Sequence, residues 1–155
     1  MTDTTQTRAT ALTFLQGHRT GVLSTLSPLG NPRSRLVYFA ADSDFNVYFM
    51  SMNNTRKAED IRAHNQAAFT VSSEEVPQTM QIEGMVEDIT DRPTADDTVE
   101  ALFANLRSNT TYFTPLARLD RGDIRFYRIT PTWMRFGDFI SGHSSAEVFT
   151  KLDTD

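Results

Sequence analysis

The chain has 155 residues, a formal net charge of -5 and no cysteine. This length suits one domain with a sizeable core, 1–155, and leaves no room for a second domain of ordinary size. An acidic chain lacks the basic face that nucleic acids and anionic membranes require, and without cysteine it has no disulfide, thiol nucleophile or iron–sulfur ligand.

The first half of the chain is predicted to form a helix followed by strands. Residues Thr7–Gln16 carry apolar side chains at helical spacing, whereas residues 1–6 are expected to be frayed. The β-prone run Thr20–Leu26 and the Pro- and Gly-containing turn after it predict a hairpin with an arginine-containing strand at 33–40. The remaining elements of this half are a turn at 42–46, a strand at 46–51 and a helix that ends near His64.

The second half is predicted to contain more strands and one more helix. Residues 67–73 and 79–89 have strand patterns, and Gly84 inside the second predicts a bulge or bend that helps a sheet to curl. Helical periodicity predicts a helix at Thr94–Asn105. The rest is expected to be a loop at 108–122, two strands at 123–132 and 133–139 separated at Pro131, and a C-terminal tail at 140–155.

This order of elements predicts a mainly β fold. About seven strands, mostly joined by hairpins, with three helices favour a six- to seven-stranded antiparallel barrel over a parallel sheet. The first residues lack the apolar core of a signal peptide, and no apolar run is long enough to span a membrane. We therefore expect a soluble, cytoplasmic protein.

Two arginines are predicted to share one face of their strand with apolar side chains. Alternation places Arg33 and Arg35 on the same side as Val37 and Phe39. Such a strand either ends at solvent or presents its arginines to an anion that lies against an apolar wall.

Arg56 and Lys57 are predicted to occupy the first turn of the next helix, after a cap at Asn54 or Thr55. Cations are unfavourable there, because the turn has free N–H groups and the positive end of the helix dipole. A bound phosphate dianion reverses that preference. Solvated surface charge is the alternative interpretation, but the neighbouring arginine strand favours a phosphate site.

The order of these motifs resembles a known family. The segments 35–40 (RLVYFA), 49–51 (FMS) and 55–58 (TRKA) are similar to the flavin-binding core of the pyridoxamine 5'-phosphate oxidase-like split barrels. The resemblance runs from about Leu12 to Phe136. It implies an antiparallel split barrel, a homodimer with FMN at the subunit interface, and a flavin-dependent oxidoreductase that acts on an unidentified small molecule or redox partner.

The resemblance also implies which residues hold the flavin. The backbone of Arg35, Leu36, Val37 and Tyr38 lines the ring edge, and Met50 and Ser51 at the end of the next strand supply a hydroxyl. Thr55, Arg56 and Lys57 at the helix start hold the phosphate. Thr79, Gln81, Trp133 and Arg135 on later strands complete the site. Burial in the core is the alternative for Trp133. No catalytic side chain is expected, because the isoalloxazine carries the hydride or electron.

The chain departs from the pyridoxamine phosphate oxidases themselves. Ala40 stands where those enzymes have a lysine, and the C-terminal Arg-x-His-x-Arg motif that binds pyridoxal phosphate is absent. Vitamin B6 oxidase activity is therefore not expected, and the resemblance points to the general-stress-protein branch.

Other chemistry has less support in the residues. The histidines His18, His64 and His143 are isolated, so no metal site is predicted, and no serine lies in a Gly-x-Ser-x-Gly motif. Two alternatives stay open. One is the same barrel with F420 or with haem, for which His143 is a conceivable ligand, and the other is a cofactor-free stress or binding protein that captures a phosphorylated metabolite.

Overall fold

The computed structural model describes residues 4–92, 124–140 and 148–154. These residues form two helices and eight strands: α1 (Thr4–Gln16), β1 (Thr20–Leu26), β2 (Pro32–Tyr38), β3 (Ala40–Ala41), β4 (Val47–Met52), α2 (Arg56–Ala63), β5 (Gln66–Ser73), β6 (Gln78–Asp88), β7 (Ile124–Asp138) and β8 (Phe149–Leu152).

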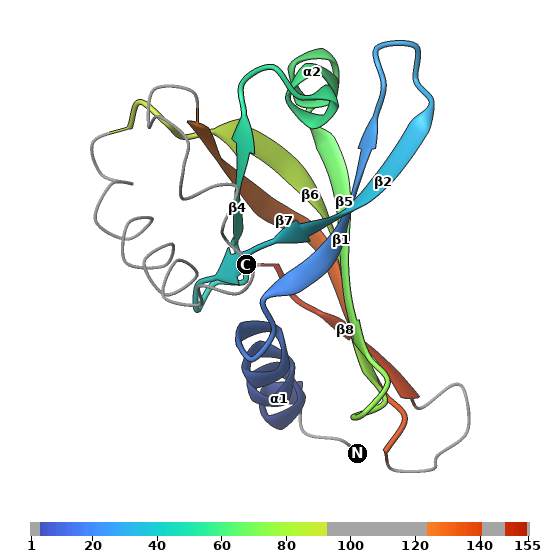
Figure 1. The fold of residues 1–155 in the computed structure, drawn as a ribbon. Helices are drawn as coiled ribbons and strands as arrows, with labels where there is room; N and C mark the ends of the chain where they lie inside the picture. The colour runs from blue at the N-terminus through green and yellow to red at the C-terminus, as the bar shows by residue number, and fades with distance from the viewer. Residues whose placement is uncertain (1–3, 93–123, 141–147, 155) are drawn as a thin grey trace.

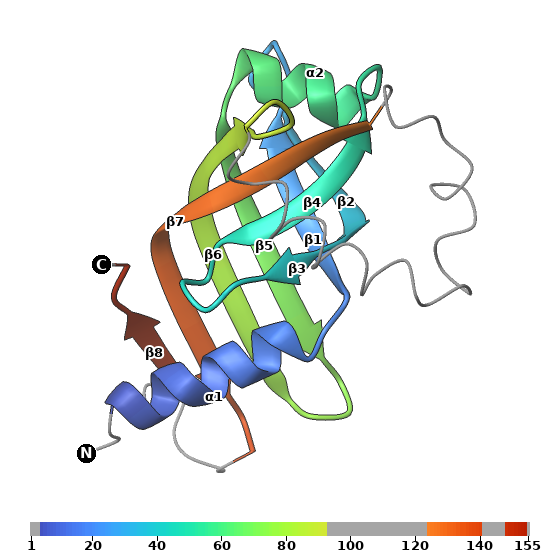
Figure 2. The same cartoon turned by 90° about the vertical axis from the view of Figure 1, so that its left-hand side faces the viewer.

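All strands belong to one antiparallel sheet. Its order is β2-β1-β5-β6-β7-β4-β3, and β8 pairs with β7 beside this path. The sheet curls into a half-barrel, with α2 at one end and α1 at the other (Figures 1 and 2). The predicted antiparallel split barrel is confirmed.

The interior is filled by alternate residues of the strands. Burial alternates along β1, β5 and β6, and the rings of Phe39 and Phe69 meet edge to face with centroids 4.9 Å apart. Full burial of each such side chain stabilises the fold by about 1.5–3 kcal/mol. Helix α1 adds Phe14 and Leu15 to the same core.

Gly84 marks a bulge between β6 and β7, as the sequence predicts. Glu83 pairs with Trp133 and Gly84 pairs with Pro131, so Thr132 is an extra residue on β7. A Cβ on Gly84 would lie 2.4 Å from the carbonyl oxygen of Thr130, so the strands approach too closely for a side chain. The bulge bends the two longest strands and helps the sheet to curl.

Pro131 does not separate two strands, which corrects the sequence expectation. Strand β7 is continuous over Ile124–Asp138 because Pro131 lies at the bulge. On the other side of β7, β4 pairs only as far as Ile129 and β8 begins only at Met134. Proline is tolerated where a strand has a bulge or an unpaired edge.

The ends of several elements also differ from expectation. Helix α1 begins at Thr4, inside the segment expected to be frayed, and the expected C-terminal tail contains β8. The arginine strand ends at Tyr38, although the N–H of Phe39 still donates to the carbonyl of Arg19, the residue before β1. The helix expected at 94–105 and the loop at 108–122 lie outside the described residues. Neither described helix has the length and apolar character needed to cross a membrane.

Candidate functional site

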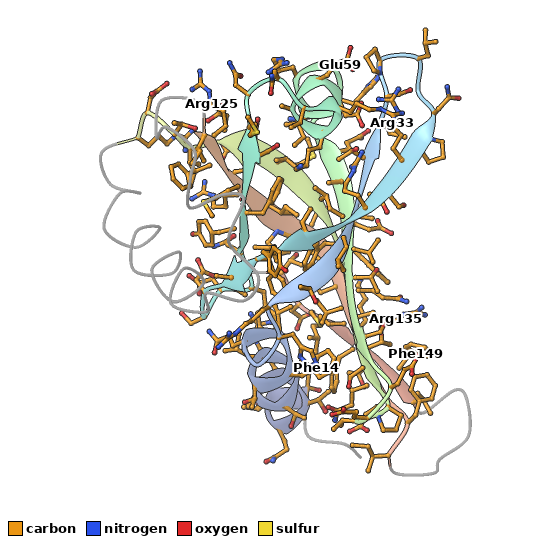
Figure 3. All side chains as sticks on the ribbon, in the orientation of Figure 1. Phe14, Arg33, Glu59, Arg125, Arg135 and Phe149 are labelled. Carbon is orange, nitrogen blue, oxygen red and sulfur yellow. The ribbon has the colours of Figure 1, made fainter. Side chains whose placement is uncertain are left out.

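Arg33 and Arg35 lie on the side of β2 that faces α2, as the alternation predicts. Val37 and Phe39 follow them on this side and are buried, whereas Leu36 points the other way and is 66% exposed. Figure 3 shows Arg33 next to Glu59 of α2. The inward face of β2 therefore has apolar residues in the core at one end and two arginines below α2 at the other.

A buried carboxylate holds both arginines. Asp60 of α2 has no exposed surface, and its two oxygens accept from Arg33 Nη1 at 2.8 Å and from Arg35 Nη2 at 3.1 Å. The Thr25 hydroxyl of β1 donates to Asp60 at 2.8 Å and accepts from Arg35 Nη1 at 2.5 Å. The anion predicted to face the arginine strand is therefore the carboxylate of Asp60, a residue of the protein itself.

Sequence reasoning missed Asp60 and Thr25. Asp60 follows Glu59 in a strongly charged helix, so its residue type and sequence neighbours do not distinguish it from a solvent-facing carboxylate. One signal was available. Two arginines predicted to point inward need an internal counter-charge, because a buried unpaired charge is very costly.

Helix α2 begins where the sequence places it. Thr55 is the N-cap, and its hydroxyl accepts from the N–H of Ala58 at 3.4 Å. The hydroxyl of Ser51, at the end of β4, lies 2.6 Å from that of Thr55. The predicted neighbourhood of Ser51 and the helix start is therefore present.

Arg56 and Lys57 occupy the first turn of α2, but their surroundings differ. Arg56 is exposed, whereas Lys57 is partly buried. Burial, and to a lesser extent the positive charge of Arg35, lower the pKa of Lys57. Within the described residues, no carboxylate forms an ion pair with Lys57, so like charges are held close together at this helix start.

A second group of expected residues lies on the outer face of the sheet. Met80, Ile82 and Met134 are buried in the core. The residues between and beside them, Thr79, Gln81, Trp133 and Arg135, are only partly buried and point outward. Trp133 is therefore not a core residue, and the alternative interpretation of its role is wrong.

Arg135 is the centre of this outer group. Its Nε and Nη2 donate to Oε1 of Gln81 at 3.1 and 2.7 Å. The guanidinium also lies over the rings of Phe149 and Trp133, at 4.0 and 5.7 Å from their centroids. The hydroxyl of Thr79 lies 2.7 Å from that of Ser72. No carboxylate among the described residues forms an ion pair with Arg135.

The register connects the outer group to exposed apolar residues. Strand pairing places one row across the face: Leu36, Val22, Thr70, Gln81, Arg135 and Lys151. Val22 and Leu36 in this row are 41% and 66% exposed. Of the other expected flavin contacts, Val37 and Met50 are buried and Tyr38 is partly buried.

The structure brings the expected residues together as two groups, not as one. Arg35, Ser51, Thr55, Arg56 and Lys57 gather at the start of α2. Strand register places the outer group on the face of Leu36, opposite to that of Arg35. Figure 3 shows Arg135 far along the sheet from Arg33 and near Phe149. Within one chain the two groups do not form a common site.

Comparison with solved structures shows that the fold is shared. The chain is similar to an FAD-binding protein from Mesorhizobium loti, with 18% identity over 83% of this chain and 91% of that chain and a TM-score of 0.68. It is similar to an F420 reductase, with 24% identity, 79% and 93% coverage and a TM-score of 0.60. It is also similar to a haem-binding protein from Mycobacterium smegmatis, with 14% identity over 95% of this chain and 57% of that chain and a TM-score of 0.68.

The family is shown by the sequence match. No curated protein matches the chain. Residues 7–137, most of the chain, match the family model described as pyridoxamine 5'-phosphate oxidase. The match spans both groups of candidate residues and agrees with the split-barrel fold. This chain belongs to the pyridoxamine 5'-phosphate oxidase family.

Proposed function

We propose that this protein binds FMN, with the flavin phosphate at the start of α2, and acts as a flavin-dependent oxidoreductase. One observation carries the proposal. Lys57 is partly buried near Arg35, and its pKa is lowered mainly by desolvation and then by the like charge of Arg35. A phosphate dianion would relieve that repulsion and accept from both side chains and from the free N–H groups of the first helical turn.

The residues present fit such a ligand. Thr55 fixes the helix start, Ser51 adds a buried hydroxyl, and Arg56 supplies a further positive charge at the rim. Val37 is packed in the apolar core on the same side of β2 as Arg35, so the site borders the core. When bound, the flavin supplies hydride or electron transfer. The side chains bind and orient the cofactor, and none is assigned as an acid or base.

The outer group supports a homodimer as part of this proposal. Thr79, Gln81, Trp133 and Arg135 do not meet the phosphate site within one chain. They lie on a face that also carries the exposed Val22 and Leu36. A second copy packed on this face would cover apolar surface and let the outer group of one chain contribute to the flavin site of the other. Light scattering tests this, and a monomer that binds FMN tightly contradicts it.

The names of the similar structures indicate which other cofactors compete with FMN in this proposal. FAD, F420 and haem are each associated with one of them. The pair of cations favours FMN, because its terminal phosphate monoester places two negative charges on one group, whereas each linking phosphate of FAD or F420 carries one. The visible absorbance of freshly purified protein distinguishes a flavin from F420 and from haem.

The decisive experiment compares FMN with riboflavin, which lacks the phosphate. Lys57→Met should weaken FMN binding about 10–100-fold, the range for loss of a charged hydrogen bond, and leave riboflavin binding unchanged. Arg19→Met, which removes an exposed positive charge in the α1–β1 connection, is the matched control and should change neither affinity. Equal affinity of the unmodified protein for FMN and riboflavin would overturn the phosphate site.

A further inference from the structure

Arg35 connects the proposed phosphate site to the interior of the barrel. Its Nη1 and Nη2 are bonded to Thr25 and Asp60. Its Nε has no hydrogen-bond partner in the described part of the chain, and the side chain is 22% exposed. One edge of the guanidinium is therefore fixed inside the protein, while its charge still acts on Lys57.

Asp60 is itself held on both sides of its carboxylate. It has no exposed surface, and both its oxygens are engaged: Oδ1 by Arg33, and Oδ2 by Arg35 and Thr25. The same residue belongs to α2, whose first turn carries Lys57. A single side chain thus ties the arginine strand to the helix that presents the phosphate site.

We propose that Asp60 is a positioning residue for the phosphate site, an inference that rests on the proposed function. Asp60 is not proposed to touch the ligand. It holds Arg35 in one arrangement before binding, so the long flexible side chain loses little further freedom when the phosphate arrives. Its negative charge also lets Arg33, Arg35 and Lys57 lie close together.

A simple effect of net charge predicts the opposite outcome. If Asp60 only reduced the positive potential of the site, its neutralisation would strengthen phosphate binding. If it positions Arg35, its neutralisation weakens phosphate binding although the site becomes more positive. The sign of the change therefore separates the two roles.

The experiment measures FMN and riboflavin affinities of the full chain and of two variants that each remove one negative charge from α2. Asp60→Asn keeps an oxygen that can accept from Thr25. It should lower the ratio of FMN to riboflavin affinity by about tenfold, as loss of outer-shell partners does at metal sites. Glu59→Gln is the matched control, because Glu59 is 57% exposed and lies 4.0 Å from Arg33 without the bridging bonds of Asp60. Its ratio should not fall.

The affinity ratio separates this role from a general loss of stability, which affects both flavins alike. An unchanged or increased ratio in Asp60→Asn overturns the inference but leaves the FMN site standing. No preference for FMN in the unmodified chain overturns the FMN site, and the inference with it. If circular dichroism shows that Asp60→Asn is unfolded, Thr25→Val replaces it. That variant removes the hydroxyl between Arg35 and Asp60, and an unchanged ratio there also overturns the inference.

Discussion

Arg35 and Arg135, each with its bonded neighbours, form two arginine centres that are built in different ways. Arg35, at the α2 end, is bonded to a carboxylate and a hydroxyl inside the barrel. Arg135, on the outer face, is bonded to a neutral amide and lies over two aromatic rings. The first arginine has a negative partner. The second has none among the described residues.

This difference indicates what each arginine is prepared for. A guanidinium that already has a buried carboxylate is fixed in place, whereas its neighbour Lys57 has no carboxylate partner among the described residues. A guanidinium stacked on rings is oriented but keeps its full charge, which suits contact with another molecule. We therefore expect changes at the α2 end to affect the stability of the chain and binding of the phosphate, and changes on the outer face to affect binding of the ring and the second subunit.

The largest effect is expected for Asp60→Ala. The change leaves Arg33 and Arg35 without their counter-charge and should lower the free energy of unfolding by about 3 kcal/mol. Urea denaturation followed by circular dichroism measures it. A loss below about 1 kcal/mol, the level of an exposed ion pair, would show that the cluster is no more stabilising than surface charge.

Arg135→Met should weaken FMN and riboflavin binding by the same factor, about tenfold, since a charged contact to the ring contributes equally to both. This contrasts with Lys57→Met, which should affect FMN alone. Fluorescence titration with each flavin gives both affinities. If Arg135→Met lowers only the FMN affinity, then Arg135 acts on the phosphate and the division between the two centres is wrong.

The pH dependence should report Lys57. Its pKa is lowered in the unliganded protein, mainly by burial and then by Arg35, and a bound phosphate would raise it again. Binding of FMN therefore takes up a proton above the lowered pKa, so the ratio of FMN to riboflavin affinity falls as the pH rises toward the ordinary value of 10.5. One proton gives at most about a tenfold change per pH unit.

Lys57→Arg provides the control for this titration, because a guanidinium stays charged throughout that range. Its affinity ratio should not depend on pH there. A ratio that falls equally in both proteins would mean that another group titrates.

The smallest effect is expected for Gln81→Ala. The amide accepts from an arginine that is also held by two rings, so the free energy of unfolding should fall by less than about 1 kcal/mol. The same denaturation experiment as for Asp60→Ala compares the two centres directly. A loss as large as that for Asp60→Ala would remove the distinction between a buried and a stacked arginine.

Much of the fold follows from local patterns. Alternation in β2 places Arg33 and Arg35 on the inner side, and Thr55 caps α2 as its side chain allows. Gly84 predicts the bulge because no side chain fits there. The expected break at Pro131 is wrong because a bulge and an unpaired edge accommodate proline within a continuous strand, and no pattern within that strand reveals which neighbours it has.

The sequence by itself determined the family, the barrel and the cations at the start of α2, because periodicity, capping and motif order are properties of neighbouring residues. Only the tertiary structure decided that Asp60 is buried between two arginines and that Gln81 and Arg135 lie on the opposite face of the sheet from Arg35. Those facts depend on strand register and on how α2 packs across the barrel, which join residues far apart in the chain. Whether a charged residue is buried depends on residues that are distant in the sequence but adjacent in the fold, and local sequence patterns do not identify them.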